Sequence, residues 1–190
     1  MTSQYVQMFH IPLVHIEVKD WKTKKEKLKD LIDYKSFRKG KSDEPDTDFF
    51  YRKNFFQSDQ FDEISQESGK IKEIFWEELK EFVLGLGLTE YDITGFWFET
   101  SVKGQHHEIH NHGATGYSVV CFIEFDENYH RPTNFTAPFN NFLDGTVLIH
   151  EPSDIKEGSL IFFPSSIHHF APPNHSDIPR MILSFNLKVR

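Results

Sequence analysis

The second half of the chain is a series of short hydrophobic segments separated by turn-forming residues. Val, Ile, Phe, Tyr and Trp are frequent in these segments, which cover residues 93–102, 108–112, 117–125, 146–149, 159–163 and 181–189. Short segments of this composition, bounded by Gly, Pro, Asn and Asp, are typical of β-strands. A series of short strands that follows a mainly helical first half predicts an α+β fold, in which the second half is a sandwich or small barrel.

The first half is predicted to be mainly helical. Residues 5–18 indicate an extended segment, and Asp20 is expected to cap a helix from Trp21 to about Lys35. Hydrophobic residues at helical spacing predict the longest helix over 59–86, with Gly69 as a possible break. These helices are expected to support the strands of the second half.

The 190 residues are expected to form a single domain. Residues 1–91 would provide the N-terminal strand and the helical support, and residues 92–190 the strand core. Within the first part, 40–48 indicate a loop and 47–52 a short strand. Residues 126–145 are predicted to be a long connection, of the kind that often serves as a lid or binding loop.

Composition argues against several classes of partner. Lys and Arg total 21 and Asp and Glu total 29, for a net charge of −8, which gives no general attraction for nucleic acid or anionic lipid. Membrane spans need about 18 consecutive apolar residues, which the chain lacks, and residues 1–5 do not resemble a signal peptide. The single cysteine, Cys121, excludes an internal disulfide. We therefore expect a soluble cytoplasmic protein without nucleic-acid or membrane partners.

Histidines are the strongest functional signal. His110 and His112 form an H-x-H pair, and in an extended strand residues i and i+2 share a face, so both rings could bind one metal ion. A third candidate ligand, His169, is followed by a candidate anion-binding residue, Arg180. Glu108 would lie on the same strand face as the H-x-H pair and is an alternative ligand.

Two motifs around these residues resemble those of a known family. The first comprises Trp97, Gly104, His110-Asn111-His112-Gly113 and residues 118–122, and the second comprises residues 157–165, His169 and residues 180–186. Together they are similar to the W…G…H-x-H…S-G-V-Y-Y and G-x-L-x-x-F-P-S-x-x-x-H…R-x-x-x-S-F-N patterns of a 2-oxoglutarate/Fe(II)-dependent oxygenase family related to prolyl 4-hydroxylases. The resemblance covers about residues 92–187.

The resemblance implies a double-stranded β-helix, or jelly roll, with an Fe(II) ion at its mouth. By position, His110 would be the first ligand and His169 the distal one, while His112 stands where the superfamily usually has a carboxylate. Glu108 could supply that carboxylate instead, although the intervals to Gly104 and Ser118 favour His112. His168 and His169 point to opposite faces of an extended strand, so only one of them can be a ligand.

The same resemblance implies 2-oxoglutarate as the second cofactor. Arg180 would bind its distal carboxylate, because a guanidinium forms a bidentate, charge-assisted pair with a carboxylate. Ser184 and Tyr117 are taken as further cofactor-binding residues, and no catalytic residue is expected beyond the metal centre.

The implied enzyme is a non-haem iron 2-oxoglutarate-dependent dioxygenase. It would use molecular oxygen to hydroxylate a C–H bond of a peptide or small molecule and would release succinate and carbon dioxide. One alternative is a three-His iron dioxygenase that does not use 2-oxoglutarate, and another is a non-catalytic β-helix binding module. The sequence indicates neither the substrate nor the oligomeric state.

Overall fold

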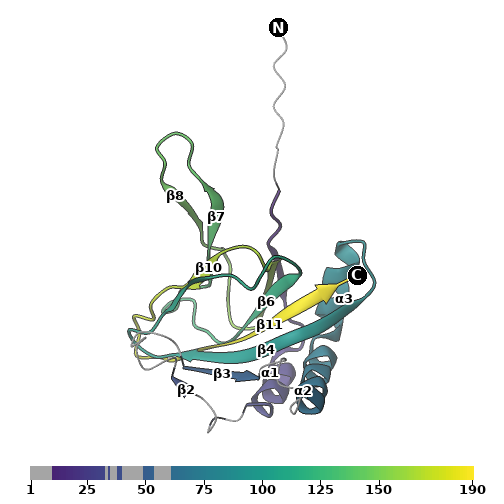
Figure 1. Cartoon of the computed structure of the whole chain (residues 1–190). Coiled ribbons are helices and arrows are strands. Elements are labelled where there is room, and N and C mark those ends of the chain that lie inside the picture. The colour runs from purple at the N-terminus through teal and green to yellow at the C-terminus, as the bar shows by residue number, and fades with distance from the viewer. Residues whose placement is uncertain (1–9, 33, 35–37, 40–48, 54–60) are drawn as a thin grey trace.

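The structure is a computed structural model that describes residues 10–32, 34, 38–39, 49–53 and 61–190. Across these residues the chain forms two antiparallel β-sheets and a small number of helices (Figure 1). The expectation of a strand-rich second half supported by helices from the first half is confirmed. The predicted loop over 40–48 lies outside the described residues.

The larger sheet has the strand order β1-β9-β6-β11-β4-β3-β2 in the described part of the chain. Its strands are β1 (Val14–Glu17), β2 (Arg38–Lys39), β3 (Phe49–Lys53), β4 (Tyr91–Ser101), β6 (Tyr117–Glu124), β9 (Ser159–Pro164) and β11 (Arg180–Val189). The strand predicted over 5–18 is therefore limited to β1 within the described residues. The strand predicted over 47–52 corresponds to β3.

The smaller sheet has the order β5-β10-β7-β8. Its strands are β5 (His107–His110), β7 (Asn134–Asn140), β8 (Val147–His150) and β10 (His169–Ala171). The chain passes from the larger sheet to the smaller one between β4 and β5, and it repeatedly crosses back until β11. This exchange places the ends of β5 and β10, which carry histidines, beside the central strands of the larger sheet.

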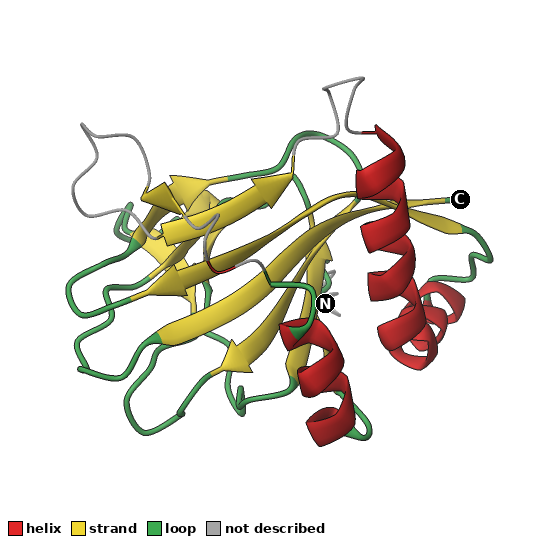
Figure 2. Cartoon of the chain, turned by 90° about the horizontal axis from the view of Figure 1, so that it is seen from below, coloured by secondary structure: helices red, strands yellow, loops and turns green. Residues whose placement is uncertain are grey.

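Three helices of the described residues cover one face of the larger sheet (Figure 2): α1 (Trp21–Lys29), α2 (Phe61–Ile74) and α3 (Trp76–Gly85). None of the helices in the described segments is long and apolar enough to cross a membrane. The predicted cap of α1 is wrong, because Asp20 has a left-handed φ of 52° and its side chain makes no capping hydrogen bond. The helix also ends at Lys29, earlier than expected.

The long helix predicted over 59–86 is two helices, and the break is at Phe75 rather than at Gly69. Phe75 leaves the helical conformation at φ −104° and ψ 22°, and its fully buried ring stacks on Phe185 of β11 at 6.2 Å. Packing on the sheet thus decides where the helix bends. Gly69 is tolerated inside α2, where a glycine costs only about 1 kcal/mol relative to alanine.

The core has two layers because neighbouring residues of a strand face opposite sides of the sheet. On β9, Phe162 faces the helices and stacks on Phe82 of α3 at 4.2 Å. The next residue, Phe163, faces the smaller sheet, where its ring lies 4.8 Å from that of Phe135 on β7. The candidate functional residues share this second layer, between the sheets.

The prediction that residues 126–145 form one long connection is wrong in part. Asn134–Asn140 form β7, which pairs with both β10 and β8, and the β7–β8 hairpin extends away from the other strands (Figure 1). Proline is unfavourable inside a regular ladder, but Pro138 lies where the β7–β8 register shifts, between Thr136 and Asn140. The strand β10 was also not predicted.

Candidate metal centre

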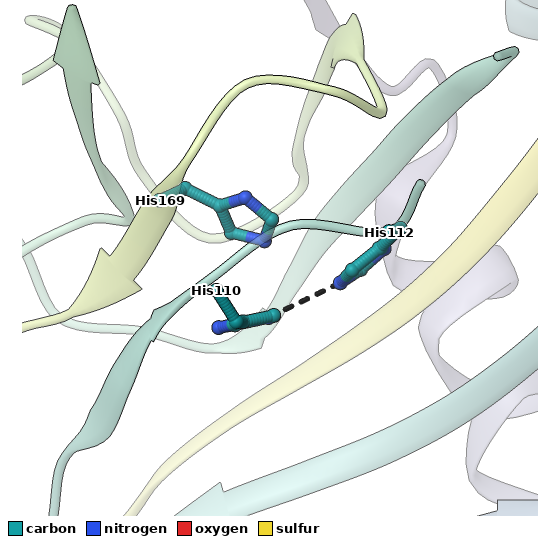
Figure 3. Close-up of side chains that lie close together, drawn as sticks. All are labelled: His110, His112 and His169. Atoms are coloured by element: carbon teal, nitrogen blue, oxygen red, sulfur yellow. Dashed lines mark hydrogen bonds between the residues drawn. The ribbon is translucent and has the colours of Figure 1, made fainter. Parts of the chain in front are cut away.

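The imidazole rings of His110, His112 and His169 converge on one point between the two sheets. One nitrogen from each ring lies within 4.8 Å of the nitrogens from the other two, and Figure 3 shows the rings turned toward one another. His110 ends β5 and His169 begins β10, directly opposite it in the strand register. Paired positions of antiparallel strands place their side chains on the same face, which explains why these two rings meet.

His112 reaches the same point from the loop that follows β5, so the predicted alternation along one strand does not apply to it. Its backbone N–H donates to the carbonyl oxygen of Ser165 at 2.9 Å, which anchors the loop to the end of β9. The chain then enters β6 through Gly116, which has a φ of 86°. Only glycine fits at this position, because the Cβ atom of any other residue would lie 2.5 Å from the carbonyl oxygen of Leu187.

Hydrogen bonds to the backbone fix the protonation of two of the rings. Nδ1 of His110 donates to the carbonyl oxygen of Glu108 at 2.7 Å, and Nδ1 of His169 donates to that of Ile167 at 3.0 Å. A carbonyl oxygen can only accept, so the hydrogen of each neutral ring is on Nδ1. Nε2 of each ring is then left with a free lone pair, which is the form that binds a metal.

His112 is held by side chains instead. Its Nδ1 lies 2.8 Å from Oδ1 of Asn186 on β11 and 2.9 Å from Oγ of Ser118 on β6. Ser118 donates to Asn186 Oδ1 at 2.9 Å and also contacts Oγ of Ser165 at 3.0 Å. Sequence reasoning did not assign a role to these residues. The available signal was a polar residue at an otherwise hydrophobic strand position, as in Ser118-Val119-Val120.

The environment favours neutral imidazoles. Burial is the main factor that lowers the pKa of His110 to about 4 and that of His169 to about 3, and the charge on neighbouring histidines lowers both further. Both rings are therefore neutral at pH 7. Nε2 of His110 lies 3.1 Å from Nε2 of His112, a contact between two lone pairs when both rings carry hydrogen on Nδ1. A cation shared between the two nitrogens would remove that repulsion.

The other residues considered as metal ligands lie outside the group of three histidines. Glu108 is exposed, and its contribution to the site is its backbone carbonyl. His168 is exposed next to Asn111, whose Nδ2 lies 3.1 Å from its Nε2, as expected for the residue that points away. His107 packs against the centre, with its ring stacked on His110 at a centroid distance of 4.1 Å.

The structure brings two of the three predicted cofactor-binding residues to the layer between the sheets. Arg180 begins β11, is only 3% exposed, and donates from Nη1 to the carbonyl oxygen of Arg131 at 3.3 Å. Ser184 is buried on the same face of β11, since alternate residues share a face. Tyr117 is not brought there. Its ring packs at 5.0 Å against Phe82 of α3, because odd-numbered positions of β6 face the helices.

Ser101 lies directly opposite Arg180 in the register of β4 and β11. Its hydroxyl oxygen is buried and has no hydrogen-bond partner among the described residues. Buried hydroxyl groups are normally satisfied, so an unsatisfied one beside a buried guanidinium is a position where a ligand oxygen would be accommodated. Sequence reasoning missed this residue.

A buried acid near the histidines was also missed. Glu99 on β4 is 4% exposed; Trp97 Nε1 donates to one carboxylate oxygen, and Nδ1 of His107 lies 3.0 Å from the other. Burial would raise the pKa of Glu99, but the charge and hydrogen bond of His107, the Trp97 hydrogen bond and the charge of Arg180 together lower it to about 2. Glu99 is therefore a carboxylate anion at neutral pH.

Several solved structures have a similar fold. A prolyl-4-hydroxylase from Pseudomonas putida is 15% identical, with 94% of this chain and 92% of that chain covered and a TM-score of 0.56. A viral collagen prolyl hydroxylase from Paramecium bursaria Chlorella virus-1 is 14% identical, with coverage of 92% and 94% and a TM-score of 0.56. At this identity the likeness concerns the fold alone.

A non-heme alpha-ketoglutarate-dependent carbocyclase from nogalamycin biosynthesis is 9% identical, with 92% of this chain and 78% of that chain covered and a TM-score of 0.64. No curated protein matches the sequence significantly. Residues 95–186 match the family described as "Putative 2OG-Fe(II) oxygenase". This segment, which contains the three histidines and Arg180, is similar to the 2OG-Fe(II) oxygenase family, and the resemblance predicted from its motifs is confirmed.

Proposed function

We propose that the protein is an Fe(II)- and 2-oxoglutarate-dependent oxygenase whose metal is held by His110, His112 and His169. The observation that carries this proposal is the convergence of three imidazole nitrogens within 4.8 Å of one another. The Nδ1 atoms of the same rings are engaged with oxygen atoms, so each Nε2 is available to a metal. Imidazole suits ferrous iron, and three protein ligands leave coordination positions open.

The cosubstrate fits the opposite part of the same layer. Arg180 offers a buried guanidinium for the distal carboxylate of 2-oxoglutarate, and the unsatisfied hydroxyl of Ser101 lies opposite it in the sheet. Ser184, on the same face of β11, would contact the cosubstrate next to Arg180. Iron with 2-oxoglutarate would supply oxygen activation, with decarboxylation to succinate and carbon dioxide and hydroxylation of a substrate C–H bond.

The protein's own contribution would be to orient the ligands and to exclude water. The ring of Trp97 lies 4.9 Å from that of His112, and the ring of Phe163 lies 4.7 Å from that of His169. These aromatic side chains leave little room for water behind the two histidines. A dry, preorganised site strengthens electrostatic interactions with bound groups and limits side reactions.

We further propose that β4 to β11 form a double-stranded β-helix. The support is their division into the interleaved orders β4-β11-β6-β9 and β5-β10-β7-β8, with the chain crossing repeatedly between the two sheets. In this view residues 92–190 are the core of a single domain, and residues 1–91 provide its support. We expect the protein to act in the cytoplasm.

The substrate is proposed only as a class. The names of structurally similar proteins include hydroxylases of prolyl residues and enzymes of small-molecule biosynthesis, so a peptide and a small molecule are both suitable. Molecular oxygen is the other substrate. The net charge of −8 makes nucleic acid the least suitable partner.

Thermal unfolding tests the proposal directly. Mn(II), an oxygen-inert substitute for Fe(II), would be added with and without 2-oxoglutarate to the wild type, to Arg180→Ala and to Arg131→Ala. Arg131 is a matched control, since its exposed side chain pairs with Glu151 while its backbone carbonyl, which Arg180 contacts, is retained. A ligand at a hundredfold excess over its Kd stabilises the fold by about 2.7 kcal/mol. We expect 2-oxoglutarate to stabilise only the metal-loaded wild type and Arg131→Ala.

A second function is favoured by one observation, the purely histidine ligand set. A three-His iron dioxygenase without 2-oxoglutarate predicts stabilisation by Mn(II) but no further effect of 2-oxoglutarate on any variant. If neither addition stabilises the wild type, both enzymatic assignments fail, and a non-catalytic binding module becomes the better description.

A further inference from the structure

We propose that Glu99 supplies the negative charge that the three-histidine ligand set lacks, and that it acts on the metal from outside the coordination sphere through His107. This inference rests on the proposed function, because it requires a metal ion at His110, His112 and His169. Glu99 is thus assigned as a positioning residue rather than as a ligand.

The charge balance of the centre motivates the assignment. A divalent ion with two histidines and one carboxylate leaves a net charge of +1, whereas three neutral histidines leave +2. A buried charge without compensation is strongly unfavourable, so an anion close to the centre would increase metal affinity.

The geometry connects Glu99 to the ligands in two steps. Its carboxylate is 3.0 Å from Nδ1 of His107, and the ring of His107 stacks on His110 at 4.1 Å. Trp97, two residues before Glu99 on the same face of β4, donates to the carboxylate and also contacts His112 with its ring. The acid is therefore held by two side chains that each touch a different candidate ligand.

Other acids do not meet these conditions. Two carboxylic acids are buried among the described residues, Glu78 and Glu99. Glu78 lies on the helical side of the larger sheet, where Nζ of Lys24 pairs with it at 2.8 Å. Glu108, the nearest acid in sequence to the histidines, is exposed. Glu78 and Glu108 are consequently good controls, the first for loss of a buried acid and the second for loss of an acid near the ligands.

Metal affinity tests the inference without any activity assay. The dissociation constant for Mn(II) would be measured by calorimetry on metal-free wild type, Glu99→Gln, Glu78→Gln and Glu108→Gln. Groups that support metal ligands typically contribute about 10–100-fold to metal affinity, so we expect a weakening of this size in Glu99→Gln. Glu78→Gln and Glu108→Gln should bind Mn(II) like the wild type. Glu99→Asp, which restores the charge, should recover most of the affinity.

Each outcome has a separate meaning. If the wild type binds Mn(II) and Glu99→Gln binds it equally well, the inference is refuted while the proposed function survives. Equal losses in Glu99→Gln and Glu99→Asp would show that the shape of the side chain matters rather than its charge, and this result also refutes it. If Glu99→Gln fails to fold, His107→Gln interrupts the same connection and should show the same weakening. Absence of Mn(II) binding in the wild type would instead count against the metal centre itself.

Discussion

His110 and His169 face each other across β5 and β10, and each ring donates its Nδ1 hydrogen to the carbonyl oxygen of the residue two positions earlier in the chain. The backbone of two paired strands thus sets the orientation of both rings. The ring of His112 is instead held by the side chains of Ser118 and Asn186. Side-chain substitutions around the centre should therefore affect His112 more readily than the other two histidines.

Removing a single candidate ligand should abolish stabilisation by metal. At a hundredfold excess of Mn(II) over its Kd, the wild type should gain about 2.7 kcal/mol, or about 5–10 °C in unfolding temperature for a chain of this size. His169→Ala should show almost none of this gain, because the two remaining histidines bind Mn(II) far more weakly. Scanning calorimetry with and without Mn(II) measures the difference.

The adjacent histidine provides the control for that experiment. His168 is exposed and points away from the centre, so His168→Ala should keep the full response to Mn(II). A response lost equally in both variants would mean that the segment, rather than the ring of His169, is responsible. A response retained in both would remove His169 from the ligand set.

Asn186 should matter for metal affinity more than for folding. Asn186→Ala removes one of the two partners of His112 Nδ1 and the acceptor for Ser118 Oγ, so the ring of His112 would be held less firmly. Loss of such an outer partner typically lowers metal affinity by about 10–100-fold. Unfolding of the metal-free variant should show a loss of only about 1–3 kcal/mol, from the unpaired polar groups. Asn141→Ala should leave the metal affinity unchanged, because its side chain accepts a hydrogen bond from Leu143 in the β7–β8 connection and lies outside the centre.

Acid should destabilise the metal-free protein through the buried histidines. The pKa of His169 is about 3 in the folded state, below the ordinary value of 6.5, so the unfolded chain binds more protons between these values. The stability that the neutral ring of His169 contributes is therefore fully present above pH 6.5, and it is lost as the pH drops toward 3. One such group accounts for at most about 2 kcal/mol between pH 7 and pH 5.

Urea unfolding in the presence of a chelator would measure this effect. His169→Gln lacks the titrating ring and should lose less stability between pH 7 and pH 5 than the wild type or His168→Gln. Identical losses in all three proteins would show that His169 is not the group responsible. Below pH 4.5, Glu99 should add to the acid loss, because its pKa is lowered to about 2 in the fold.

Much of the strand core was predictable from sequence because its segments are short, hydrophobic and bounded by turns. The strands β4, β6, β9 and β11 were located to within about two residues. The strand β7 was not, because Pro138 and the polar residues of Asn134–Asn140 conceal it. Its position also depends on pairing with β10, a distant partner that a local pattern does not reveal.

The candidate site was predictable at the level of its ligands and not of their surroundings. The H-x-H pair and His169 are conspicuous in sequence, and the structure brings them together. Tyr117 was misplaced because both faces of β6 are buried, so hydrophobic alternation gives no direction for its ring. Glu99 looked like an ordinary strand residue, since its burial follows from contacts with His107 and Trp97 rather than from its own segment.

The neighbouring phenylalanines of β9 allow site support to be separated from general stability. The ring of Phe162 packs against Phe82 of α3, whereas the ring of Phe163 lies 4.7 Å from that of His169. Both are at most 1% exposed, so Phe162→Leu and Phe163→Leu should each reduce the free energy of unfolding by about 1–2 kcal/mol, less than the 3–5 kcal/mol typical of truncation to alanine. Only Phe163→Leu should weaken Mn(II) binding, because it removes the surface against which His169 is held. Calorimetric titration of both metal-free variants with Mn(II) measures this difference. Equal weakening of Mn(II) binding in the two variants would indicate that the centre responds to overall stability rather than to this contact.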